Sequence, residues 1–233
     1  MDFTPVTTQQ PLPIGQKDGH VQPTELLRRG PVSVRNATES EEDREFIGKL
    51  VIEAFERKVV HATSRASLPA MNTIYSNHMR GRPPLFYERH FIAEYNGERA
   101  GTCVLHYHGD AELFPYRSED IPPLSCCDMC GLWVSKLGIP SDYPAGKCYL
   151  DPICVDEKFR GKGIGKVLLD MAEIDAKKRG CKVIYLLVAT TNRAQHLYER
   201  QGYHVIEKHS LCCCGYWCMT GEREFARMDK VLD

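Results

Sequence analysis

The clearest pattern of apolar and polar positions lies in the C-terminal half of the chain. Residues 148–155 (CYLDPICV) form an apolar run of strand length. From Ile164 to Ile174, apolar residues recur at helical spacing with charged residues between them, which predicts an amphipathic helix that ends at Gly180. A second apolar run, 183–189 (VIYLLVA), is rich in β-branched and aromatic residues and predicts a buried strand. The segment is therefore predicted to be a strand, helix and strand with a right-handed crossover.

The same patterns predict the elements on either side of this unit. In chain order, these are a strand at 32–35, a helix from about 38 to 60, a helix over about 67–78 that has Pro69 in its first turn, a hairpin of strands 90–95 and 98–107, and a closing antiparallel hairpin of strands 205–209 and 224–231. In the first two helices, apolar residues recur at helical spacing, so each helix has one apolar face to bury.

The remaining segments have no such periodicity. Residues 1–30 contain several prolines and glutamines, which predicts a flexible N-terminal tail. Residues 31–233 are long enough for one domain with a sizeable core. The link at about 109–147 is unusually long and rich in proline. Because a connection of that length is normally functional, we predict an insertion that forms a lid or a binding loop.

Composition narrows the class of protein. The 233 residues carry a formal net charge of -1, with a pI near 6.7, which argues against a large nucleic-acid-binding surface. The sequence contains no run of 18 apolar residues, which is the length that would predict a membrane span. The first ten residues lack the pattern of an export signal. We therefore expect a cytoplasmic protein whose 11 cysteines are reduced. No pattern indicates its oligomeric state.

A glycine-rich turn, 160–165 (RGKGIG), lies where the first strand gives way to the helix. The first N–H groups of a helix have no partner in the helix and lie at the positive end of its dipole, where an anion is stabilised. Glycine lets a phosphate approach the backbone closely, and Arg160, Lys162 and Lys166 add positive charge. The spacing fits neither G-x-G-x-x-G nor G-x-x-x-x-G-K-[ST]. The turn therefore predicts a phosphate site of another kind.

Two motifs make the prediction specific. Residues 155–165 resemble the acyl-CoA pyrophosphate loop of the GNAT superfamily of acetyl-CoA-dependent N-acetyltransferases, and 192–203 resemble its second signature at the expected distance. The resemblance covers roughly residues 32–231, and the link at 109–147 departs from it. It implies an α/β (α+β) fold: a mixed, mostly antiparallel central sheet flanked by helices, with a splay between two central parallel strands.

The resemblance also implies acetyl-CoA as the acyl donor and assigns its contacts. The implied residues are Ile153, Cys154, Val155, Arg160, Gly161, Lys162, Gly163, Ile164, Gly165, Lys166 and Asn192. Pro152 cannot donate a hydrogen bond within a sheet, so the residues themselves predict a local break in pairing there. In the family, the backbone freed at this point binds the pantetheine arm. Asn192 also has a simpler interpretation as the cap of the helix that follows it.

Two residues are candidates for proton transfer. Tyr198 occupies the family position of the general acid, and a phenol of pKa near 10 is protonated at neutral pH; a tyrosine that only packs against the helix is the alternative. Asp151, predicted to share a face with Ile153, is the candidate base, directly or through water; a capping or surface aspartate is equally consistent with the sequence. His106 and His108 are weaker candidates for the base.

The first hypothesis is an enzyme that transfers an acetyl group to a primary amine, in a small molecule or a peptide, by direct attack within a ternary complex. The alternative is an acyl-CoA-binding regulatory module without turnover. The cysteine groups 126–130 (CCDMC) and 212–218 (CCCGYWC) raise a third hypothesis, a zinc site shared between them. We assign no metal ligand on this pattern.

Overall fold

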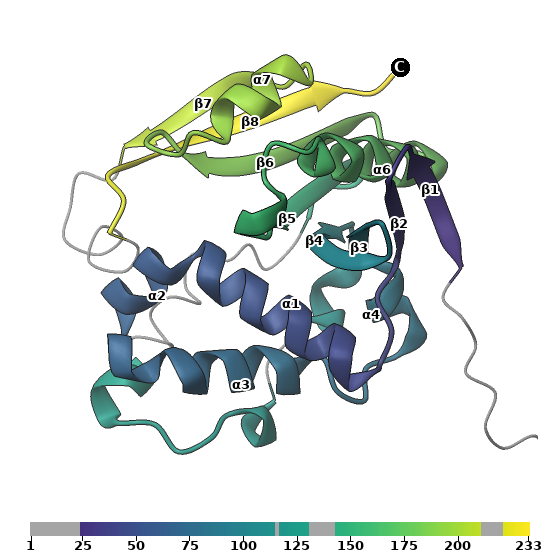
Figure 1. Ribbon diagram of the computed structural model, residues 1–233. Coiled ribbons are helices and arrows are strands. Elements are labelled where there is room, and N and C mark those ends of the chain that lie inside the picture. The colour runs from purple at the N-terminus through teal and green to yellow at the C-terminus, as the bar shows by residue number, and fades with distance from the viewer. Residues whose placement is uncertain (1–23, 115–116, 131–142, 211–220) are drawn as a thin grey trace, which may run out of the picture.

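The computed structural model describes residues 24–114, 117–130, 143–210 and 221–233. Its strands form one sheet in the order β1-β2-β3-β4-β5-β6-β8-β7 (Figure 1). The strands are β1 (Glu25–Arg29), β2 (Val32–Asn36), β3 (His90–Tyr95), β4 (Glu98–His106), β5 (Lys147–Val155), β6 (Val183–Ala189), β7 (His204–Ser210) and β8 (Glu224–Val231). Every neighbouring pair is antiparallel except β5 and β6, which are parallel. The predicted mixed, mostly antiparallel sheet is confirmed.

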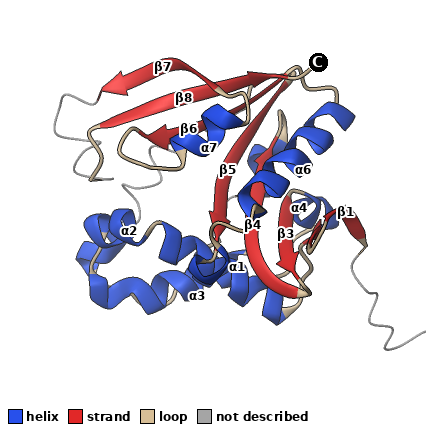
Figure 2. Ribbon diagram, turned by 45° about the horizontal axis from the view of Figure 1, so that its top comes forward, coloured by secondary structure: helices blue, strands red, loops and turns tan. Residues whose placement is uncertain are grey.

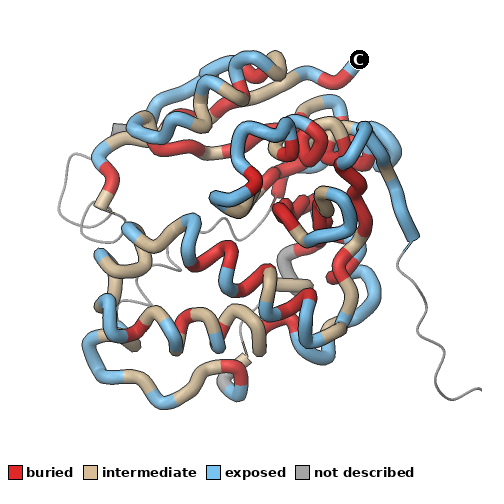
Figure 3. The backbone as a smooth tube through the Cα atoms, in the orientation of Figure 1, coloured by how far each residue is buried: buried red, intermediate tan, exposed pale blue. Residues whose placement is uncertain are grey.

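Helices cover both faces of the sheet (Figure 2). The α-helices are α1 (Glu41–Ala54), α2 (Glu56–Ala62), α3 (Leu68–His78), α4 (Pro84–Glu88), α6 (Ile164–Lys178) and α7 (Gln195–Arg200), and residues 126–130 are also helical. Short 3₁₀ turns are η1 (Arg65–Ser67), η2 (Asp110–Leu113), η3 (Ser118–Asp120) and η4 (Glu157–Phe159). Helix α6 packs on one face in the largest apolar cluster, while α1 and α4 pack on the other. Buried residues accordingly concentrate in the sheet and along the inner sides of α1 and α6 (Figure 3).

Three elements differ from the sequence predictions. Residues 25–29 lay in the predicted tail, but they form β1, which pairs antiparallel with β2. The single helix expected to reach residue 60 is interrupted at Phe55, whose φ of -109° and ψ of 15° lie outside the helical region. Helix α4 was not predicted, because five residues are too short to show helical periodicity.

Helix α6 follows its prediction closely. Gly180, at a φ of +76°, follows the helix, and its N–H donates to the Lys177 carbonyl at 2.9 Å. The Cys181 N–H donates to the Ala176 carbonyl at 3.0 Å, which completes a Schellman-type cap. One residue of the predicted apolar face is not buried: Ile174 is 46% exposed.

The carboxylate of Asp43 joins α1 to the sheet. It is 1% exposed and accepts hydrogen bonds from Arg35 Nη1 (2.8 Å) and Nη2 (2.9 Å), Arg99 Nε (2.8 Å), and the Thr38 N–H (2.9 Å) and hydroxyl (2.8 Å). Burial alone would raise the pKa of Asp43, but the hydrogen bonds and charge of Arg35, with the hydrogen bonds from Thr38 and Arg99, lower it to about 2. One buried side chain therefore fixes the first turn of α1 against β2 and β4.

Replacing this carboxylate should destabilise the fold strongly. In Asp43→Asn, the buried Arg35 keeps its charge and loses the carboxylate that its Nη1 and Nη2 contact, with Glu94 left as its remaining counter-ion, so we expect a loss of about 3 kcal/mol in the free energy of unfolding measured with urea. Asp170→Asn is the control, because Asp170 pairs with the largely exposed Lys166 and should cost less than about 1 kcal/mol. Equal effects of the two changes would contradict the role of Asp43.

The pH dependence of stability has a definite sign. Because the pKa of Asp43 is lower in the folded state than its ordinary 3.8, its contribution is complete above that value and is lost as the pH falls towards 2. A shift to about 2 corresponds to roughly 2 kcal/mol. Urea denaturation between pH 5 and pH 2 should show this decrease in the wild type, with a shallower slope in Asp43→Asn.

Candidate active site

Strand β5 contains a β-bulge at Asp151 and Pro152, which are joined by a cis peptide bond. On β4, Leu105 pairs with Leu150 and Cys103 pairs with Ile153, so two residues of β5 lie opposite one of β4. The break in pairing predicted at Pro152 is confirmed.

The bulge also changes which residues share a face. Leu150 and Ile153 both pack in the cluster under α6, although they are three residues apart. The extra residue reverses the alternation of side chains, so Asp151 lies on the opposite side from Ile153. The prediction that Asp151 and Ile153 share a face is therefore wrong.

Strands β5 and β6 separate after Tyr149, just before the bulge. Their parallel pairing covers only Lys147, Cys148 and Tyr149, whereas β6 continues along β8 as far as Ala189. Figures 1 and 2 show the two strands together at one end and apart at the other. The predicted splay is confirmed. It leaves β5 residues 150–155 paired to β4 but not to β6.

The glycine turn lies at the open end of the splay. Gly161 and Gly163 have φ values of +77° and +81°, which explains why glycine occupies both positions. Gly163 immediately precedes the first turn of α6, which has neither a side-chain cap nor an acidic residue. The N–H groups of this turn are therefore available to an anion.

Gly165 has a different role. A Cβ atom at this position would lie 3.0 Å from Cδ2 of Leu197, so glycine allows the start of α6 to approach α7. The two predicted motifs are therefore in direct contact. Leu197 belongs to the second motif and packs against the largest apolar cluster, as does Val155.

The three cations of the turn have different environments. Nζ of Lys162 lies 4.6 Å from the ring centroid of Tyr95 and 5.0 Å from that of Phe159, which hold the ammonium beside the turn without neutralising it. Arg160 is exposed and lies 3.7 Å from Glu157. Lys166 donates to Asp170 at 3.1 Å. The turn therefore keeps a positive potential on its outer side.

Tyr198 lies in α7, on the other side of the splay from β5. It is 6% exposed and packs in the largest apolar cluster, with its ring centroid 6.1 Å from that of Tyr203. Burial raises the pKa of Tyr198, and the neighbouring Cys154 and Asp151 raise it further. The phenol is therefore protonated at neutral pH.

Asp151 lies in the bulge and is partly buried. Burial raises its pKa, while the ammonium of Lys58 and hydrogen bonding with the Tyr149 hydroxyl act in the opposite direction. Lys58 was not singled out from the sequence, because its position on a helix predicts an ordinary solvated lysine. Its approach to Asp151 depends on the packing of α2 against the open splay, for which no local pattern gives a signal.

Each of the two histidines donates a hydrogen bond to a backbone carbonyl. His106 Nε2 donates to the Asp151 carbonyl at 2.7 Å, and burial lowers the pKa of His106 to about 4, so the ring is neutral. It therefore supports the bulge. His108 Nδ1 donates to the Tyr143 carbonyl at 2.9 Å. Asn192 Oδ1 accepts from the Ala194 N–H at 2.9 Å, which makes it a local cap ahead of α7.

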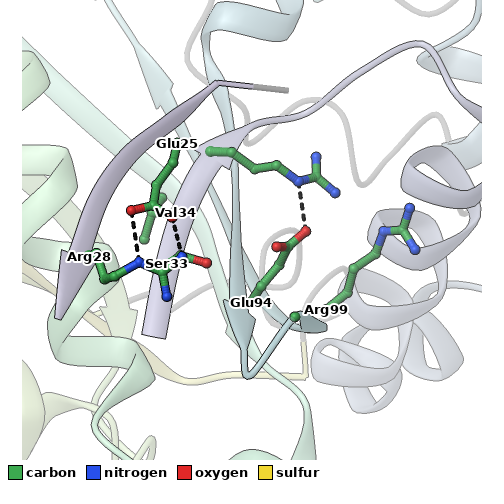
Figure 4. Close-up of a pocket in the computed structure, with 8 residues that line it drawn as sticks. Glu25, Arg28, Ser33, Val34, Glu94 and Arg99 are labelled. Carbon is green, nitrogen blue, oxygen red and sulfur yellow. Dashed lines mark hydrogen bonds and ion pairs between the residues drawn. The ribbon is translucent and has the colours of Figure 1, made fainter. Parts of the chain in front are cut away.

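A separate hollow of about 390 Å³ lies at the β1 edge of the sheet and contains none of the predicted site residues (Figure 4). Its charges compensate one another: Arg35 Nε donates to Glu94 at 2.7 Å, and Arg28 Nε donates to Glu25 at 2.9 Å. We assign it no role in acyl transfer.

The proposed zinc site falls largely outside the described residues. Cys126, Cys127 and Cys130 are exposed, and residues 212–218 are not described. Among the residues that are described, no group of three or more His, Cys, Asp or Glu is arranged to hold a metal ion. In the same part of the chain, no helix has the length and apolar character needed to cross a bilayer.

The splayed sheet, the glycine turn and the buried phenol define an acyltransferase fold. The chain belongs to the acetyltransferase (GNAT) family, whose model matches residues 65–203, more than half of the chain. Two solved structures are similar across most of its length. The yncA structure from Salmonella typhimurium, with its cofactor acetyl-CoA, is 16% identical, covers 88% of this chain and 95% of that one, and has a TM-score of 0.54. An N-acetyltransferase from Staphylococcus aureus Mu50 is 16% identical, covers 87% of this chain and 99% of that one, and has a TM-score of 0.52.

Curated relatives match over shorter segments. The mycothiol acetyltransferase of Propionibacterium freudenreichii subsp. shermanii is 34% identical over 79 residues, 34% of this chain and 25% of that protein. The spermine/spermidine N(1)-acetyltransferase of Bacillus subtilis (strain 168) is 38% identical over 64 residues, 27% of this chain and 42% of that protein. The matched segments therefore span less than half of the length of either relative.

The glycine turn can be tested with a matched pair of variants. Gly163 and Gly180 lie at opposite ends of α6 with similar positive φ values, and neither has an atom within 4 Å of an added Cβ. Alanine should therefore strain the backbone equally at both positions. We expect Gly163→Ala to weaken acetyl-CoA binding at least about tenfold by calorimetry, and Gly180→Ala to change it less than about twofold. Equal affinities would contradict the assignment of the turn.

Proposed function

We propose that this acetyltransferase transfers the acetyl group of acetyl-CoA to a primary amine by direct attack within a ternary complex. The observation that carries the proposal is the position of the two groups on elements that separate: Asp151 lies in the bulge of β5, and Tyr198 lies in α7, which follows β6. The two elements thus provide a protonated phenol and a carboxyl group whose pKa burial raises. These are the two proton-transfer groups that amide formation from an ammonium and a thioester requires.

The donor would be held by backbone groups at two places. The N–H groups at the start of α6, with Arg160, Lys162 and Lys166 around them, would bind the pyrophosphate. The backbone of β5 at Ile153 and Val155, which β6 does not pair, would bind the amides of the pantetheine arm. Asn192, just ahead of α7, would also contact the pantetheine arm. Binding at both places would place the thioester between the bulge and Tyr198.

In the proposed mechanism, Asp151 accepts a proton from the acceptor ammonium, directly or through water. The environment raises the pKa of Asp151, which makes the carboxylate a stronger base than an exposed aspartate. Tyr198 gives its proton to the sulfur as the carbon–sulfur bond breaks. Burial raises the pKa of the nearby Cys154 thiol as well, so this residue stays protonated, which supports direct transfer over an acyl-cysteine route.

The alternative is a regulatory module that binds acyl-CoA without turnover. The two curated relatives are named for different acceptors, so the acceptor is left as a small-molecule or peptide amine. A panel of amines with CoA release as the readout separates the two hypotheses. Turnover with any amine supports the enzyme, and acetyl-CoA binding without CoA release across the panel supports the regulatory module.

Tyr198→Phe tests the proposed acid. Removing only the hydroxyl should leave acetyl-CoA binding intact and lower kcat by about 10- to 10⁴-fold. Tyr203→Phe is the matched control, because Tyr203 lies beside Tyr198 and its buried hydroxyl has no hydrogen-bond partner among the described residues. It should retain turnover. If Tyr198→Phe turned over as fast as the control, the proton would have to come from another group.

Asp151→Asn tests the proposed base through the pH profile. Because the base acts when ionised and its pKa is raised, the acid limb of kcat/KM should lie above the ordinary aspartate value near 3.8. The variant should lose at least about 10²-fold in kcat/KM and should lack that limb. An unchanged limb in the variant would assign it to a different group, such as the acceptor amine.

A further inference from the structure

We propose that Lys58 is an acetylation site of the protein's own active centre, modified from bound acetyl-CoA when no other amine occupies the opening. The inference rests on the proposed function and adds an internal acceptor to it. Its basis is a primary amine from α2 that lies beside Phe225, the partner of Ala189 at the end of β6 where β5 and β6 are apart.

The geometry around Lys58 brings together both halves of the molecule. Its Nζ lies 5.0 Å from the ring centroid of Phe55, which ends α1, and 4.9 Å from that of Phe225, which lies at the start of β8. The neighbouring Arg57 forms an ion pair with the buried Glu222, so α2 is held against the same segment. Figure 1 shows α2 beside the beginning of β8, across the open side of the splay. Two aromatic rings therefore hold the ammonium where the two halves meet.

The proton-transfer groups are neighbours of this amine. The charges of Lys58 and Asp151 affect each other's pKa, and Asp151 in turn affects Tyr198. Burial also lowers the pKa of Lys58, which favours the neutral amine. An amine, a candidate base and a candidate acid thus lie on the elements around the opening, in α2, β5 and α7. In this arrangement Lys58 occupies the place that the proposed mechanism gives to the acceptor.

The reaction balances without another reagent. Asp151 takes one proton from the Lys58 ammonium, the nitrogen lone pair forms a bond to the thioester carbonyl carbon, and the carbon–sulfur bond breaks with its electron pair on sulfur. Tyr198 protonates the sulfur. Of the three ammonium protons, one remains on the amide, one replaces the proton that Tyr198 gave to CoA, and one passes to solvent. The products are acetyl-Lys58, CoA and a proton.

Lys49 provides an internal comparison. It lies on the neighbouring α1 and its side chain is 71% exposed, so it reports the uncatalysed reaction of acetyl-CoA with an accessible lysine. An uncatalysed process should favour this exposed amine over the half-buried Lys58. A preference for Lys58 would therefore require the active site.

The experiment incubates the full chain with isotopically labelled acetyl-CoA and follows each lysine by peptide mass spectrometry. We expect Lys58 to gain label at least about tenfold faster than Lys49, with a rate independent of protein concentration. In Tyr198→Phe the preference should disappear while slow labelling of Lys49 continues. An amine that the enzyme acetylates should slow the labelling of Lys58 when present at saturation.

The outcomes separate this inference from the proposed function. Turnover of free amines with Lys58 labelled no faster than Lys49 would overturn the inference and leave the function standing. Labelling of Lys58 that persists in Tyr198→Phe would also overturn it, as an uncatalysed reaction. If neither turnover of free amines nor preferential labelling of Lys58 were observed, both the inference and the proposed function would be overturned. Preferential labelling that depends on Tyr198 would support both.

Discussion

The separation of β5 from β6 is the constraint on which the rest of the site depends. Two parallel strands that pair over only three residues leave facing backbone groups without sheet partners beyond that point. Such groups are satisfied by water or by a ligand. The bulge at Asp151 and Pro152 produces this opening from the β4 side, and His106 supports the bulge through the Asp151 carbonyl. In the proposed complex, the pantetheine arm would supply partners for these groups.

An opening of this kind requires the two halves of the sheet to be fixed independently. Asp43 fastens α1 to β2 and β4 on the N-terminal side. On the other side, β6 is held by β8, and Glu222 joins them to α2 through Arg57 and accepts from the Thr191 hydroxyl at 3.0 Å. The opening thus lies between two groups of elements, one joined by Asp43 and the other by the β6–β8 pairing and Glu222. Its open side is crossed by a contact between α2 and the start of β8, where Lys58 lies.

The sequence predicted the parts of this arrangement that depend on neighbouring residues. Apolar periodicity located α6 and β6, Pro152 marked the break in β5, and the glycines marked the turn. The parts that depend on distant partners were missed or wrong. The prediction that Asp151 and Ile153 share a face was wrong because a bulge reverses the alternation of side chains. Lys58 was missed because Phe225, 167 positions away in the chain, decides where its ammonium lies. The roles proposed for Tyr198 and Asp151 came from the family resemblance, since no local pattern joins the two residues.

In the proposed reaction, the burial that makes the opening costly for a charged acceptor also favours the chemical step. Asp151 and Lys58 shift in opposite directions, the carboxyl towards higher pKa and the ammonium towards lower pKa, because burial favours the neutral form of each. An amine acceptor that enters the same environment encounters the same preference. Its ammonium therefore loses a proton more readily than in water, and the carboxylate beside it is a stronger base. Aminolysis starts from an ammonium and ends with a neutral amide, so an environment that disfavours the ammonium assists the step that produces the nucleophile.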